Sequence, residues 1–150
     1  MIKSVIHSQT TADFIAQFEG FSAKAYKCPA GVWTIGYGTT VYSNGLPVKR
    51  GDTITEQGAK RMLEDYIDNE IRPNLAGLGL KSGGQITAIA SLVYNIGWSA
   101  FAKSKCCKAL KAKDYATFIK EYDWFKGGGK VLPGLLKRRT AELAMFFSDI

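Results

Sequence analysis

Glu19 combines a residue type and a position that suit acid–base chemistry. It stands at the end of an apolar run that contains Phe14, Ile15 and Phe18, and Phe21 follows it. If this run is a short helix, the negative end of the helix dipole and the apolar neighbours both favour the protonated carboxyl group. A carboxyl group that holds its proton near neutral pH can act as a general acid. A solvated glutamate at a helix end is the alternative interpretation.

Cys28 and Thr34 follow Glu19 at short distances in the sequence. Eight residues separate Glu19 from Cys28, and five separate Cys28 from Thr34. A cysteine thiolate is a base and a nucleophile where its surroundings lower its pKa, and a threonine hydroxyl can orient a water molecule or the thiol. An inert buried thiol and an ordinary strand threonine are the alternatives.

The other reactive residue types argue against several kinds of site. His7 is the single histidine, so neither a Ser-His-Asp triad nor a three-histidine zinc site is expected, and no metal or other cofactor is predicted. The three cysteines, Cys28, Cys106 and Cys107, are odd in number and have no CxxC spacing. This usage is typical of a reducing compartment rather than of a disulfide framework.

The elements that must position these residues are predicted to be one helix and a small sheet. Thr10 or Thr11 is expected to cap a short helix that ends at Gly20. Residues 32–42 are rich in β-branched and aromatic side chains and have turn residues on both sides. They predict an antiparallel sheet of two or three strands.

The remainder of the chain is predicted to be mostly helical, which makes the fold class α+β. The expected elements are a helix from Thr53 or Thr55 to near Pro73, one from the Ser82 capping box to Gly97, helices around 101–110 and 114–122, a flexible glycine loop at 127–129, and a last helix from Pro133.

Positive charge is concentrated in the second half of the chain. Of 150 residues, 20 are Lys or Arg and 13 are Asp or Glu, which gives a net charge of +7. Residues 1–75 hold 8 basic and 8 acidic side chains, whereas residues 76–150 hold 12 and 5. This excess favours a polyanionic partner. The lysines that recur over 103–113 are spaced too irregularly for one helical face, so a solvated surface is expected. Attraction to an anionic cell envelope is the alternative. Few aromatic residues lie among them, which argues against nucleic acid.

The N-terminal residues do not suggest a targeting segment. No apolar run reaches the length of about 18 residues that a membrane span needs. The first residues lack the continuous apolar core and the cleavage pattern of a signal peptide. We therefore expect neither a signal peptide nor a membrane anchor, and a location in the cytoplasm of the cell that makes the protein.

Several segments in order resemble the phage-type lysozymes, the endolysins of glycoside hydrolase family twenty-four. The active-site signature of that family is a Glu, eight residues, an Asp or Cys, five residues, and a Thr ahead of a Gly-x-Gly turn. Glu19, Cys28 and Thr34 match both spacings. The resemblance continues over 85–97, 101–104 and 128–142 and covers about residues 12–147.

The resemblance implies a lysozyme-like fold: a single domain over 1–150, with a small N-terminal lobe at about 12–55, a helical lobe at about 56–150, and a cleft between them. It also implies that Glu19 is the general acid and that Cys28 stands where many relatives have a second carboxylate. The saccharide-binding positions that it implies are Gly36, Tyr37, Gly38, Tyr94 and Ser104. For Tyr94 and Ser104, core packing or capping is an equal alternative. Arg138 and Arg139 are assigned no catalytic role; either one pairs with an acid near Glu19 or both are surface charges.

The expected function is hydrolysis of the β-1,4 bond between N-acetylmuramic acid and N-acetylglucosamine in peptidoglycan, for host-cell lysis. A lytic transglycosylase, which forms an anhydro product without water, and a basic cell-wall-binding module are the alternatives. The expected partners are peptidoglycan and, for access to the wall, a separate holin. Nucleic acid is not expected, and the protein should be a monomer that stays in the host cytoplasm until lysis.

Overall fold

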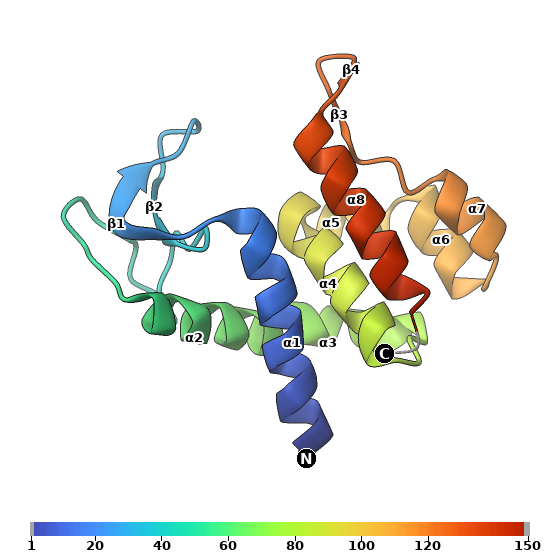
Figure 1. Cartoon of the computed structure of the whole chain (residues 1–150), viewed down its shortest axis with the longest axis horizontal. Coiled ribbons are helices and arrows are strands. Elements are labelled where there is room, and N and C mark those ends of the chain that lie inside the picture. Colours follow the sequence, from blue (N-terminus) through green and yellow to red (C-terminus); the bar gives the residue numbers. More distant parts are fainter. Residues whose placement is uncertain (1, 149–150) are drawn as a thin grey trace. The chain divides into compact units, whose positions relative to one another are not determined.

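The computed structural model describes the backbone of residues 2–148 and the side chains of residues 11–148. The side chains of His7 and Thr10 therefore lie outside the described residues. The chain forms two compact units, Met1–Glu70 and Ile71–Ile150. The first unit contains helix α1 (Ile2–Glu19), strands β1 (Ser22–Lys27) and β2 (Trp33–Gly36), and helix α2 (Glu56–Tyr66) (Figure 1).

Helix α1 begins earlier in the chain than predicted. It starts at Ile2, not at Thr10 or Thr11, and Thr11 is fully buried within it. No glycine or proline interrupts residues 2–19, so nothing in the backbone forces a later start. The predicted end is confirmed: Gly20 has a φ of +72°, the left-handed conformation that commonly follows a helix.

The predicted antiparallel sheet is confirmed with two strands. Ser22 pairs with Gly36 and Tyr26 with Thr34, so three residues of β1 face a single residue of β2 between these pairs. Such a bulge bends a strand. Strand β2 is shorter than the predicted stretch of 32–42 because the chain folds back at once. Ile35 and Thr39 exchange two backbone hydrogen bonds of 2.9 Å across this turn.

Helix α2 packs on both α1 and β2. Thr55 caps it by accepting a hydrogen bond from the Gly58 N–H at 3.0 Å. Lys60 on α2 forms an ion pair with Asp13 on α1. These contacts place α2 in the first unit, which ends at Glu70.

The helix that was predicted to stop near Pro73 is divided into shorter pieces. After α2 the chain forms a π-helical turn, η1 (Ile67–Ile71), and then the short helix α3 (Arg72–Leu75). Pro73 lies in the first turn of α3, where its missing N–H costs no helical hydrogen bond. A 3₁₀ turn, η2 (Ala76–Leu78), follows α3.

The second unit is built on two helices that lie side by side, α4 (Gly83–Ile96) and α8 (Pro133–Phe146) (Figure 1). The Ser82 hydroxyl accepts from the Gln85 N–H at 3.1 Å, which confirms the predicted cap. At the crossing, a Cβ on Gly84 would lie 2.5 Å from the Met145 carbonyl oxygen of α8. The absence of a side chain at Gly84 is therefore what lets the two backbones approach.

Three short helices complete this unit: α5 (Trp98–Ala102), α6 (Lys105–Lys111) and α7 (Tyr115–Lys120). The predicted helix around 101–110 is thus two helices, separated at Ser104, whose hydroxyl caps α6. Asp114 caps α7. Phe118 of α7 is fully buried, and its ring lies 4.7 Å from that of Phe146. Phe101 lies between two tryptophan rings, 6.0 Å from Trp98 and 6.2 Å from Trp124.

The predicted glycine loop is a β-hairpin. Strands β3 (Lys126–Gly127) and β4 (Lys130–Val131) pair antiparallel around Gly128 and Gly129. Both glycines have positive φ, 58° and 79°, the conformation that tight two-residue hairpins require. Helix α8 then begins at Pro133 as predicted, and the α+β class is confirmed. Among the described residues, no helix has the length and apolar character needed to cross a membrane.

Candidate active site

Glu19 is the last residue of α1, and its side chain is half-buried. Gly20 turns the chain out of the helix, and β1 begins two residues later at Ser22. The glutamate is therefore held at a fixed point between a helix and the strand that leads to Cys28. A general-acid role for Glu19 remains a prediction.

Cys28 lies directly after β1, in a tight turn that leads to β2. Its N–H donates to the Val32 carbonyl at 3.0 Å, and its carbonyl accepts from the Gly31 N–H at 2.8 Å. Hydrogen bonding from the backbone at Val32 and Ala30, and then from the Thr34 hydroxyl, lowers the pKa of the half-exposed Cys28 thiol below its ordinary value. The turn thus favours a thiolate that solvent can reach.

Thr34 is the neighbour of Cys28 across this turn. It is buried on β2, opposite Tyr26, and its hydroxyl donates to the Val32 carbonyl at 3.0 Å. The same hydroxyl contributes to the lowered pKa of Cys28. Thr34 can therefore orient a group beside the thiol, as the sequence predicts, and this role remains a prediction.

The Gly36-Tyr37-Gly38 turn has a structural explanation within the first unit. Gly36 has a φ of +65°, and a Cβ there would lie 3.0 Å from the Ala59 Cβ of α2. Tyr37 is buried, its ring centroid lies 5.6 Å from that of Phe21, and burial raises the pKa of its hydroxyl. Close packing on α2 explains the glycine at position 36, and Gly38 is exposed with a φ of +93°. Contact of the three residues with a saccharide remains a prediction.

Tyr94 and Ser104 belong to the second unit. Tyr94 is half-buried on α4. The Ser104 hydroxyl donates to the Phe101 carbonyl at 2.6 Å and accepts from the Cys107 N–H at 3.0 Å. Ser104 is therefore a helix cap, which was one of the two interpretations of this position. The first unit alone supplies Glu19, the Cys28–Thr34 pair and the glycine turn.

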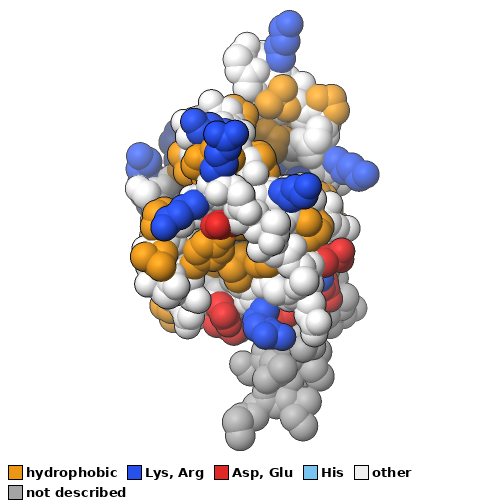
Figure 2. Space-filling view, turned by 90° about the vertical axis from the view of Figure 1, so that its left-hand side faces the viewer, with side chains coloured by type: hydrophobic (Ala, Val, Ile, Leu, Met, Phe, Trp, Pro, Cys, Tyr) orange, Lys and Arg blue, Asp and Glu red, His pale blue; other side chains and the backbone are white. Residues whose placement is uncertain are grey.

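Exposed apolar side chains lie near Cys28 and Thr34. Tyr26, opposite Thr34, is 44% exposed, and Val32, within the turn, is 46% exposed. The Lys27 ammonium group lies 5.5 Å from the centroid of the Trp33 ring. Figure 2 shows a face on which hydrophobic side chains are exposed among Lys and Arg side chains. A surface of this kind can hold the apolar face of a sugar ring and also attract anionic groups.

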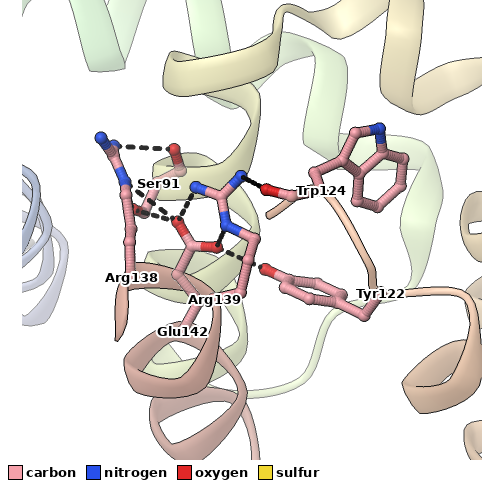
Figure 3. Close-up of polar contacts among 6 residues, drawn as sticks. All are labelled: Ser91, Tyr122, Trp124, Arg138, Arg139 and Glu142. Atoms are coloured by element: carbon pink, nitrogen blue, oxygen red, sulfur yellow. Dashed lines mark hydrogen bonds and ion pairs between the residues drawn. The ribbon is translucent and has the colours of Figure 1, made fainter. Parts of the chain in front are cut away.

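The second unit contains a buried ionic cluster that was not predicted from the sequence. It consists of Ser91, Tyr122, Arg138, Arg139 and Glu142 and is called the Glu142 cluster below (Figure 3). The two arginines are buried rather than surface charges, which corrects that expectation. Arg139 and Arg138 contact the Glu142 carboxylate at 2.8 Å and 3.3 Å. The Ser91 and Tyr122 hydroxyls donate to it at 2.6 Å and 2.9 Å.

The Glu142 cluster joins α8 to α4 and to the segment that follows α7. Arg138 also donates to the Ser91 carbonyl at 3.1 Å. Burial raises the pKa of Glu142 and lowers that of Arg139, while each charge opposes the shift of the other. The spacing of Arg138, Arg139 and Glu142 suits pairing on one helix, but Ser91 and Tyr122 are distant in the sequence. The cluster is best explained as a structural link.

Among residues 11–148, no group of three or more His, Cys, Asp or Glu side chains is arranged to hold a metal ion. The candidate site in the first unit consists of the Glu19 carboxyl group, the Cys28 thiol with its lowered pKa and the Thr34 hydroxyl.

Comparison with known proteins gives consistent matches over most of the chain. The family model described as phage lysozyme matches residues 16–142. The endolysin of Acyrthosiphon pisum secondary endosymbiont phage 1 is 39% identical over 146 residues, covering 89% of this chain and 92% of that protein. The endolysin of Salmonella phage P22 is 36% identical over 137 residues, covering 87% and 90%.

Solved structures show the same similarity. A mutant of P22 lysozyme has a TM-score of 0.78 and 32% identity, covering 93% of this chain and 96% of that chain. The muramidase domain of SpmX from Asticaccaulis excentricus has a TM-score of 0.80 and 25% identity, covering 93% and 95%. The lysozyme-like fold class predicted from the sequence is confirmed.

Proposed function

The chain belongs to the phage lysozyme family, and from this premise we propose that Glu19, Cys28 and Thr34 are its catalytic residues. The protein is a muramidase of the endolysin kind: it hydrolyses the β-1,4 bond between N-acetylmuramic acid and N-acetylglucosamine in peptidoglycan. The observation that carries the site proposal is the hydrogen-bonded turn that joins Cys28 to the strand that holds Thr34. The lowered pKa of Cys28 is consistent with it.

In the proposed mechanism Glu19 donates its proton to the glycosidic oxygen as the bond from that oxygen to the anomeric carbon breaks. The sugar that remains carries positive charge, which a nearby thiolate stabilises electrostatically. A water molecule then attacks the anomeric carbon and loses a proton. In this proposal the Cys28 thiolate accepts that proton, and the Thr34 hydroxyl orients the water.

A second route is open to the same residues. The thiolate can attack the anomeric carbon directly and form a covalent glycosyl thioether, which water then hydrolyses. The first route inverts the configuration at the anomeric carbon and the second retains it. The configuration of the first product therefore distinguishes the two roles of Cys28.

The remaining assignments follow the endolysin relatives. We propose that five residues form the saccharide site: Gly36, Tyr37, Gly38, Tyr94 and Ser104. Gly36 and Tyr37 are buried and would fix the shape of the site. We also propose that one domain over 1–150 acts as a monomer. It would stay in the host cytoplasm until a separate holin opens the way to the wall.

The test is mass spectrometry of the fragments released from purified peptidoglycan. The native protein should release fragments with reducing N-acetylmuramic ends. Glu19→Gln should lower the rate by about 10²–10⁴-fold, the usual contribution of a general acid. Glu64→Gln, another half-buried glutamate on a helix of the first unit, is the matched control and should remain active.

Two outcomes would contradict parts of the proposal. Full activity in Glu19→Gln would remove Glu19 from catalysis, and anhydro ends in place of reducing ends would indicate a transglycosylase. Cys28→Ser and Thr34→Val should each lower the rate while leaving the fold intact by circular dichroism. Near-normal activity in Cys28→Ser would exclude an essential thiolate.

A further inference from the structure

Helix α6 carries an exposed face made of lysines. Lys105, Lys108 and Lys111 recur at every third residue and are all exposed, whereas Cys106 and Leu110 between them are buried. These three residues are called the lysine face below. Residues three apart share a face of a helix, and the first and last of them are about 9 Å apart along the axis. The five lysines of 103–113 are irregularly spaced as a set, but the three on α6 form a regular row.

Two further lysines extend this positive surface. Lys113 follows α6 with a φ of +58°, and Lys81 precedes the cap of α4. The neighbouring Lys81 side chain lowers the pKa of Lys113. Like charges near each other repel, and a bound anion would relieve that repulsion. The positive end of the α4 dipole adds to the same potential.

Few acidic residues lie close to these lysines in the sequence. Residues 103–113 include five lysines and no Asp or Glu, and among the described residues no ion pair involves any of these lysines or Lys81. Asp114 comes next, but its carboxylate accepts from the Thr117 N–H as a helix cap. Glu121 and Asp123 act on the buried Cys106, whose pKa they help to raise.

We propose that the lysine face, with Lys81 and Lys113, is a second binding surface for peptidoglycan that pairs with the free carboxylates of its peptide stems. The proposal rests on the proposed function, which supplies the polymer. Exposed lysines in a row suit a chain of repeated anionic groups rather than a single small ligand. The absence of aromatic side chains on α6 disfavours single-stranded nucleic acid, which binds through base stacking.

The experiment measures retention on purified sacculi that have been stripped of accessory phosphate polymers. All proteins carry Glu19→Gln so that the wall is not digested. One variant replaces Lys105, Lys108 and Lys111 with Gln. The matched control replaces three other exposed lysines of the same unit, namely Lys126, Lys130 and Lys137, so both lose the same charge. A parallel set of sacculi has its carboxylates converted to amides.

At low salt the lysine-face variant should show about a tenfold higher apparent dissociation constant than the control, from three exposed charge pairs of ordinary strength. The difference should vanish near 1 M salt, where the screening length is only about 3 Å. It should also vanish on amidated sacculi. In the active background, both triple variants should cleave a short glycan of N-acetylmuramic acid and N-acetylglucosamine, with its carboxylates converted to amides, at the native rate.

Three results would overturn the proposal. Equal retention of the two triple variants would mean that total charge, not this face, matters. A difference seen only on sacculi that keep their phosphate polymers would assign the face to those polymers. A difference that survives amidation would exclude the carboxylates. Failure of the proposed function is distinguishable, because it would appear as an absence of cleavage by the native protein.

Discussion

Glu142 is a buried carboxylate that forms ion pairs with two buried guanidinium groups. Arg139 and Arg138 contact it at 2.8 Å and 3.3 Å, and its own side chain is fully buried. The change Glu142→Gln keeps the size of the side chain and removes its charge. The Ser91 and Tyr122 hydroxyls donate to different carboxylate oxygens, so the single amide oxygen keeps one of these hydrogen bonds, and the variant loses the negative charge together with the other.

The expected loss of stability follows from the two arginine charges that remain buried in the variant. Two positive groups, 5% and 1% exposed, would lie together with no carboxylate between them. Breaking a buried ion pair by removing one partner costs about 3–5 kcal/mol. Domains have total stabilities of about 5–15 kcal/mol, so the loss is a large fraction of the whole. For a chain of this size it corresponds to a fall in Tm of about 6–20 °C.

Thermal and urea unfolding measure this loss, followed by circular dichroism. Asp65→Asn, an exposed carboxylate on α2, is the control and should change stability by less than about 0.5 kcal/mol. The double variant with Arg139→Gln should lose less than the sum of the two single changes, because the two side chains interact. A fall in Tm of under about 3 °C for Glu142→Gln, or strict additivity in the double variant, would refute the reasoning.

Three other predictions concern packing, the thiol and acid stability. Gly84→Ala should cost about 1–3 kcal/mol in urea unfolding, because its Cβ would lie 2.5 Å from a carbonyl oxygen of α8. Gly134→Ala, which meets no atom within 4 Å, should be neutral or stabilising, and equal losses would contradict the packing argument. Brief alkylation of the native protein near pH 8 should modify Cys28 alone, since burial raises the pKa of the other two thiols; mass spectrometry showing two labels would disprove this. Hydrogen bonding, mainly from Tyr42, holds the pKa of Asp52 below its ordinary 3.8, so its stabilisation is present above that pH and lost as pH falls through the folded value. Asp52→Asn should therefore flatten the acid end of the stability curve, and an unchanged curve would refute it.

The sequence predicted local elements well where short-range chemistry decides them. Ser82 and Thr55 are helix caps because a hydroxyl can satisfy an exposed N–H at a helix start. Pro133 begins α8 because proline fits the first turn of a helix. Gly20 ends α1 because it adopts a positive φ without strain.

The predictions failed where distant contacts decide the outcome. The first helix was predicted to begin at Thr10 or Thr11, yet the backbone is helical from Ile2. The burial of Arg138 and Arg139 depends on Ser91 and Tyr122, which no local pattern connects to them. The local sequence does not predict contacts with residues that belong to other helices or strands.

The candidate site was predicted in part by reasoning and in part by resemblance. The position of Glu19 at a helix end could be read from the sequence, and the structure places it there. The lowered pKa of Cys28 could not be read in this way, because it arises from the geometry of the turn that leads to Thr34. Ser104 matches a saccharide-binding position of the family, and in the structure its hydroxyl caps a helix. The resemblance alone did not distinguish these two interpretations.

The distribution of the three tryptophans gives each compact unit an optical reporter of its own. Trp33 is the single tryptophan of the first unit, and the Lys27 ammonium group lies 5.5 Å from the centroid of its ring. Trp98 and Trp124 flank Phe101 in the second unit. Replacing both with Phe would leave fluorescence that follows the first unit alone. Comparing its transition with that of far-ultraviolet dichroism would reveal whether the two units melt together or one after the other.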